Sequence, residues 1–125
     1  MLKVHIRKLG TAAVISLQGQ IVNGETETLR NAVKSLSGVR TVIIDLARVS
    51  IVDAKGFGVM LELRAQAETE GIRFELMNVP KQVGMLLELT RLDSVFRITS
   101  RVRFLRSRSR SSRRRASALR LASCA

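Results

Sequence analysis

The sequence of 125 residues lacks tryptophan and tyrosine and contains one cysteine, one histidine and one proline. Because Cys124 is the only cysteine, no disulfide can form within the chain, and nothing requires an oxidising compartment. Cys124 has no predictable base nearby, which argues against a catalytic nucleophile. His5 has no second histidine or cysteine with which to share a metal, so we interpret it as a solvent-facing strand residue. We expect neither a metal nor a cofactor.

Long apolar runs are also missing, since no segment approaches the roughly 18 apolar residues that would suggest a membrane span. The first ten residues alternate apolar and basic side chains instead of forming the apolar block of a signal peptide. A cytoplasmic location is the default expectation. With 46% hydrophobic and 3% aromatic residues, the core of this domain-sized chain must be aliphatic.

Acidic residues are absent from the C-terminal end of the chain. Residues 101–125 contain nine arginines and no acid, whereas residues 1–100 have 13 basic and 10 acidic side chains. The net charge of +12 therefore comes mainly from an Arg/Ser-rich segment with too few apolar residues to join a core. We place a domain at residues 1–100 and a disordered basic tail at 101–125.

Within the domain, hydrophobic periodicity predicts eight elements in the order β-β-α-β-α-β-α-β. Strands separated by helices favour a sheet with parallel pairs, and the opening hairpin adds an antiparallel edge. The predicted class is α/β, with a small mixed β-sheet and helices packed against it. The strands are expected at residues 2–7, 12–19, 41–46, 72–77 and 95–98, and the helices at 25–36, 57–70 and 80–90.

The stretch "IVDAKGFGV" passes from the central strand to the second predicted helix. Its two glycines, Gly56 and Gly58, do not complete any nucleotide-binding fingerprint, and close helix packing explains both better. Asp45 and Asp53 lie at or just after the carboxyl end of this strand, where open α/β sheets place functional loops. Asp53 is also well placed to cap the helix. Ser50 is interpreted as a polar loop residue.

Four stretches of the sequence resemble the STAS domain family, which includes bacterial anti-sigma factor antagonists. They are "VISLQGQI", the leucine-centred helix that follows it, "TVIIDLARVSIVDAKGFGVML" and "GIRFELMNVPKQVGMLLELTRLDSVFRI". This resemblance covers residues 2–99 and implies a docking module instead of an enzyme.

In antagonists of this family, the corresponding turn reads D-S-S-G, and an anti-sigma factor that is a kinase phosphorylates its second serine. Here the matching residues are Asp53-Ala54-Lys55-Gly56, so Lys55 replaces the phosphoacceptor. A lysine at the positive end of a helix costs about 0.3–1 kcal/mol. A second departure is Val22, where many antagonists have an acidic residue.

The resemblance therefore implies a regulator that binds an anti-sigma factor kinase and is not switched off by phosphorylation at this turn. The residues expected to bind the partner are Val22, Asn23, Gly24, Asp53, Ala54, Lys55, Gly56 and Phe57.

Three other interpretations remain open. The tail could bind nucleic acid or another anionic surface through its arginines, with little base stacking because Phe104 is its only aromatic residue. The tail could also arise from translation of a GC-rich gene out of frame. Finally, the same fold serves as a subunit of transporters or stress-signalling assemblies, and the fold alone does not decide among these functions.

Overall fold

The computed structural model describes residues 1–99, which form one mixed α/β unit with the predicted order of strands and helices. A short 3₁₀ helix, η1, precedes the last strand. The strands are β1 (Lys3–Leu9), β2 (Ala12–Ile21), β3 (Thr41–Val52), β4 (Arg73–Met77) and β5 (Arg97–Thr99); the helices are α1 (Thr26–Lys34), α2 (Ala54–Thr69), α3 (Lys81–Leu89) and η1 (Leu92–Ser94).

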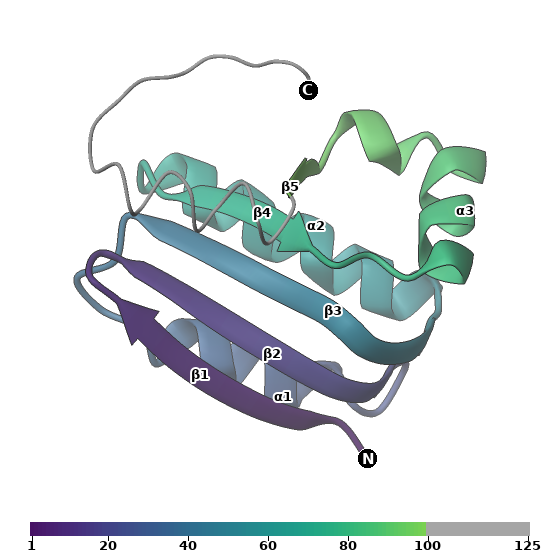
Figure 1. Ribbon diagram of the computed structural model, residues 1–125, viewed down its shortest axis with the longest axis horizontal. Helices are drawn as coiled ribbons and strands as arrows, with labels where there is room; N and C mark the ends of the chain where they lie inside the picture. The colour runs from purple at the N-terminus through teal and green to yellow at the C-terminus, as the bar shows by residue number, and fades with distance from the viewer. Residues whose placement is uncertain (100–125) are drawn as a thin grey trace.

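The five strands form a single sheet in the order β1-β2-β3-β4-β5. The pair β1 and β2 is antiparallel and the other three neighbouring pairs are parallel, as predicted. Each parallel strand lies beside the preceding one, and crossovers of this kind are right-handed in nearly all proteins. The crossover helices therefore share one face of the sheet, and Figure 1 shows α1 and α2 on the same face.

The main core lies between the sheet and this helical layer, and all three α-helices contribute to it through Leu29, Leu63, Val83 and Leu87. On the opposite face of the sheet, Val14, Ile43 and Met77 form a smaller buried cluster. The neighbours Ile43 and Ile44 are both fully buried, so β3 is covered on both faces. This explains why its sequence is a nearly unbroken β-branched run instead of an alternating pattern.

The strand β3 continues to Val52, six residues beyond the predicted end at Leu46. Its pairing with β2 shifts register twice, and such bulges break the strict alternation by which a strand is recognised. Asp45 consequently lies within the strand and not at its carboxyl end, which corrects the prediction. Its carboxylate accepts hydrogen bonds from the Asn78 side chain (3.1 Å), the Ala47 backbone (3.0 Å) and Ser16 (3.4 Å).

Ser50 also belongs to β3, so its interpretation as a loop residue was wrong. Its exposed hydroxyl donates to the carbonyl oxygen of Gly19 at 3.3 Å. The exposed histidine on β1, His5, confirms the prediction of a solvent-facing strand residue.

The helix ends differ from the predictions by one to three residues. Helix α1 ends at Lys34, α2 begins at Ala54, and Pro80 is the N-cap of α3. In α3 Val83 and Leu87 are buried, whereas Leu86 and, just after the helix, Thr90 are exposed.

An ion-paired arginine joins the first two helices. Arg30 of α1 donates to both carboxylate oxygens of Glu62 on α2, at 3.0 and 3.1 Å, and to Glu27 at 3.0 Å. These hydrogen bonds raise the pKa of Arg30 and lower that of Glu62, so both groups stay charged. The side-by-side placement of α1 and α2 is fixed by this pair as well as by the core.

None of the helices within residues 1–99 is long and apolar enough to cross a membrane. The predictions for the Arg/Ser-rich tail, including the boundary near residue 100 and the role of Cys124, lie outside the described residues.

Candidate functional site

Three connections meet at the carboxyl edge of the parallel strands. They follow the ends of β2 at Ile21, β3 at Val52 and β4 at Met77, and lead into α1, α2 and α3. Loops at this edge are the usual place for binding sites in α/β sheets. The predicted partner-binding residues lie in the first connection (22–24), at Asp53 and in the first turn of α2 (54–57), and a hydrogen bond between Asn23 and Asp53 brings the two segments together.

Asp53 fixes the turn before α2. Its side chain caps the helix by accepting a hydrogen bond from the backbone N–H of Gly56 at 2.9 Å, as predicted. The second carboxylate oxygen accepts from the backbone N–H of Asn23 at 3.0 Å. Both hydrogen bonds lower the pKa of Asp53, and the one from Asn23 has the larger effect. Capping is therefore only half of its role, because the same carboxylate ties the turn to the loop 22–24.

The loop 22–24 is itself a tight turn, closed by a hydrogen bond of 2.9 Å from the Glu25 N–H to the Val22 carbonyl. Gly24 adopts a φ of +96°, which residues with a side chain rarely do, and both it and Asn23 are exposed. The Glu25 side chain accepts from the Leu2 N–H at 2.9 Å, which attaches the start of the chain to this loop.

Gly56 lets α2 approach the end of β2 closely. A Cβ at this position would lie 2.0 Å from the Ile21 carbonyl oxygen, a backbone atom that cannot swing away. The prediction of close packing is thus confirmed for Gly56, but it is wrong for Gly58, which is exposed with open space around it. Phe57 is 8% exposed and belongs to the main core. Gly56 and Phe57 therefore support the turn from beneath.

The surface that remains for a partner is formed by the exposed residues Asn23, Gly24, Ala54 and Lys55, with Val22 and Asp53 partly exposed. Lys55 stands in the first turn of α2, which has no acidic residue. Within residues 1–99, no three His, Cys, Asp or Glu side chains gather as a metal site would require. Chemically, the arrangement offers an exposed turn, held in place by hydrogen bonds and close packing, that carries one positive charge at Lys55.

The sequence prediction missed exposed apolar side chains at this end of the molecule. On α3, which begins at the carboxyl edge, Met85 is 54% and Leu89 77% exposed, and Ile51 near the end of β3 is 49% exposed. Figure 1 shows α3 beside this end of the sheet. The run "VGMLLEL" contains more apolar residues than fit on one buried face of a helix. This excess of apolar residues could have revealed the exposed apolar surface.

Comparison with known proteins gives a consistent result. The model of the STAS domain family matches residues 3–105. The anti-sigma factor antagonist SpoIIAA, solved in its unphosphorylated form, is 20% identical with a TM-score of 0.70, over 90% of this chain and 100% of its own. A sulfate transporter family protein from Wolinella succinogenes is 19% identical with a TM-score of 0.64, over 73% of this chain and 77% of its own.

A third structure, Mglu, is 30% identical with a TM-score of 0.58, over 63% of this chain. The present chain spans only 20% of the length of Mglu. At these identities and coverages the solved structures establish the fold, and they confirm the SpoIIAA-like arrangement of sheet and helices.

Proposed function

Because the chain belongs to the STAS domain family, we propose that it is an anti-sigma factor antagonist that binds an anti-sigma factor of the serine kinase type. It acts by docking and not by catalysis. The docking surface comprises the loop 22–24 and the exposed start of α2. The structural neighbour SpoIIAA supports this proposal, since it is itself an antagonist with the same fold.

The observation that carries the proposal is the exposure of Ala54 and Lys55 on a turn whose position Asp53 and Gly56 fix. A preorganised turn loses little conformational entropy on binding, so its contacts contribute more of their energy to affinity. SpoIIAA is known in both unphosphorylated and phosphorylated forms. Lys55 has no hydroxyl to phosphorylate, so this antagonist binds its kinase without being released by phosphorylation of the turn.

The exposed apolar side chains of α3 lie at the same end of the sheet as the docking turn, and we propose that they take part in binding. Desolvation of large apolar groups such as Met85 and Leu89 is a main source of affinity in protein complexes, whereas a rim cation chiefly adds specificity. We assign the apolar contacts to α3 and the orienting contact to Lys55, which would meet an acidic group of the kinase.

Isothermal titration of the full chain with a purified anti-sigma factor kinase from the same organism tests this proposal. We expect binding whose affinity is unchanged after incubation with Mg²⁺ and ATP. Lys55→Glu should weaken binding about tenfold, the effect of a contact residue at an interface. Arg7→Glu reverses the same charge on exposed β1 and should leave the affinity unchanged.

Two results would contradict the proposal. A chain that binds none of these kinases is not an antagonist of this type. An equal loss of affinity in Lys55→Glu and Arg7→Glu would show that net charge, and not the turn, determines binding.

A further inference from the structure

A second site lies at the opposite end of the helical layer, where α1 is too short to cover α2. Both helices start at the carboxyl edge of the sheet, but α1 has nine residues and α2 sixteen. At 1.5 Å per residue, α2 extends roughly 10 Å beyond the end of α1. Residues 35–40 cross this gap without forming a helix and leave a pocket of about 210 Å³.

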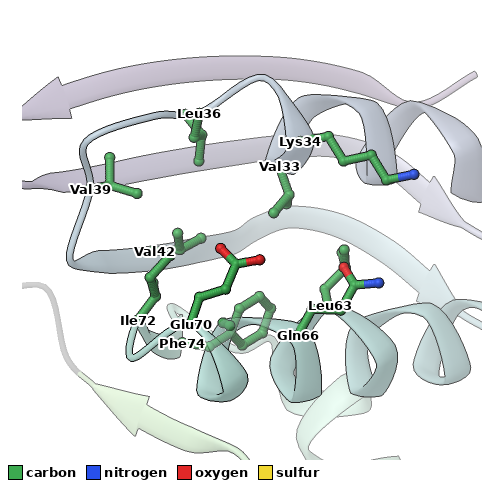
Figure 2. Close-up of a pocket in the computed structure, with 11 residues that line it drawn as sticks. Val33, Lys34, Leu36, Val39, Val42, Leu63, Gln66, Glu70, Ile72 and Phe74 are labelled. Carbon is green, nitrogen blue, oxygen red and sulfur yellow. The ribbon is translucent and has the colours of Figure 1, made fainter.

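The pocket has an apolar floor and a partly apolar rim (Figure 2). Four buried side chains form the floor and four half-buried ones the rim; the floor is Val42, Leu63, Ala67 and Phe74, and the rim is Val33, Leu36, Val39 and Ile72. A dry cavity of about 150 Å³ holds a benzene molecule, so this volume admits one ring with two or three further atoms.

One acidic side chain, Glu70, and one basic side chain, Lys34, line the pocket. Glu70 is the C-cap of α2, where the helix dipole disfavours an acid, and no basic residue stands in the last turn to compensate. The nearby Glu68 is paired with Arg64 at 3.1 Å, whereas Glu70 has no ion pair within residues 1–99. Figure 2 shows the Glu70 carboxyl group reaching over the pocket toward Val42.

Lys34, the cation among the lining residues, does not neutralise Glu70. Its ammonium group points away from the centre of the pocket in Figure 2. Its charge acts instead on Glu62, whose pKa is lowered mainly by the hydrogen bonds from Arg30 and further by Lys34. The carboxylate of Glu70 therefore faces an apolar space and forms no ion pair with any residue of 1–99.

We propose that this pocket binds a small organic cation, an amine whose apolar body is one ring with about two further carbon atoms. The apolar body fills the floor between α2 and β3, and the ammonium group lies between Glu70 and the carbonyl groups at the end of α2. The site is separated from the docking turn by the length of α2, and it does not depend on the proposed function.

Methyl-detected NMR of the full chain with 2-phenylethylammonium as the probe tests this proposal. We expect saturable shifts of the Val33, Val39 and Ile72 methyl groups. The probes 3-phenylpropionate, which carries the opposite charge, and 2-phenylethanol, which is neutral, should bind more weakly. Glu70→Gln should weaken binding of the amine about two- to fivefold, as for a partly exposed ion pair.

Glu68→Gln is the matched control. It removes the same charge two residues before Glu70, and the Glu68 side chain does not line the pocket. Its affinity for the amine should be unchanged. Ala67→Leu fills the floor of the pocket and should abolish binding. If that variant does not fold, Val33→Phe obstructs the rim and should have the same effect. Equal binding of the amine and the carboxylate, equal effects of the two glutamate variants, or shifts outside the pocket would overturn the proposal.

Discussion

Gly56 and Gly58 stand two residues apart on α2, yet replacement of each by alanine should change the stability in opposite directions. In Gly56→Ala the new Cβ would lie 2.0 Å from the Ile21 carbonyl oxygen and 2.9 Å from its carbon. These are backbone atoms, so either the first turn of α2 or the end of β2 must move. Such overpacking costs about 1–3 kcal/mol or more, against a gain in helix propensity of about 1 kcal/mol.

Because the clash at 2.0 Å is with backbone atoms, the cost should lie at the upper end of this range, and we expect a net loss of about 2 kcal/mol in the free energy of unfolding of Gly56→Ala. For a domain of this size, that lowers the melting temperature by roughly 8–16 °C. Gly58 is exposed, and a Cβ added to it would have no other atom within 4 Å, so Gly58→Ala should gain about 0.5–1 kcal/mol.

Urea unfolding followed by circular dichroism at 222 nm measures both changes, because the chain has no tryptophan or tyrosine to report by fluorescence. A Gly56→Ala protein as stable as the wild type would refute the argument that this glycine is required by close approach. An equal destabilisation by both variants would show that the loss does not come from the close approach of Gly56 to Ile21, since Gly58 has no such neighbour.

Three further predictions concern the turn and the tail. The pKa of Asp53 is lowered in the folded state. Its contribution to stability is therefore present above the unfolded pKa and is lost as the pH falls through the folded pKa. When the melting temperature is measured against pH, Asp53→Asn should reduce the fall in melting temperature at acid pH. Lys55→Ser recreates a hydroxyl at the family position, and mass spectrometry should detect phosphate there after kinase treatment but none on residues 53–57 of the wild type. Deletion of residues 101–125 removes nine positive charges and should abolish salt-sensitive retention on DNA; unchanged retention would exclude nucleic-acid binding by the tail.

Much of the fold could be predicted because its elements follow local rules. The alternation in β1, the β-branched run of β3 and the 3.6-residue spacing in α2 each report burial by a neighbouring layer. The predictions failed where long-range pairing decides the outcome. Residues 47–52 do not alternate, and they remain in β3 because β2 continues to pair with them across two register shifts.

The candidate site could be located from the sequence only in part. The motif around Asp53 and Lys55 marks the turn, since Asp is one of the residues that favour the N-cap position just before a helix. The second hydrogen bond of Asp53, to Asn23, spans 30 residues and has no local signal. The same holds for the pocket beneath Glu70, which depends on the different lengths of two helices that only the fold places side by side.

The sequence by itself determined the order of the strands and helices, that the core is mainly aliphatic, and that Asp53 stands just before the second helix. These properties depend on residue type and on spacing within one segment. Only the tertiary structure decided that Gly56 is constrained while Gly58 is free, that Phe57 lies beneath the turn, and that Glu70 lies at an apolar pocket without an ion pair to any residue of 1–99. Each of these depends on which distant atoms share the same space.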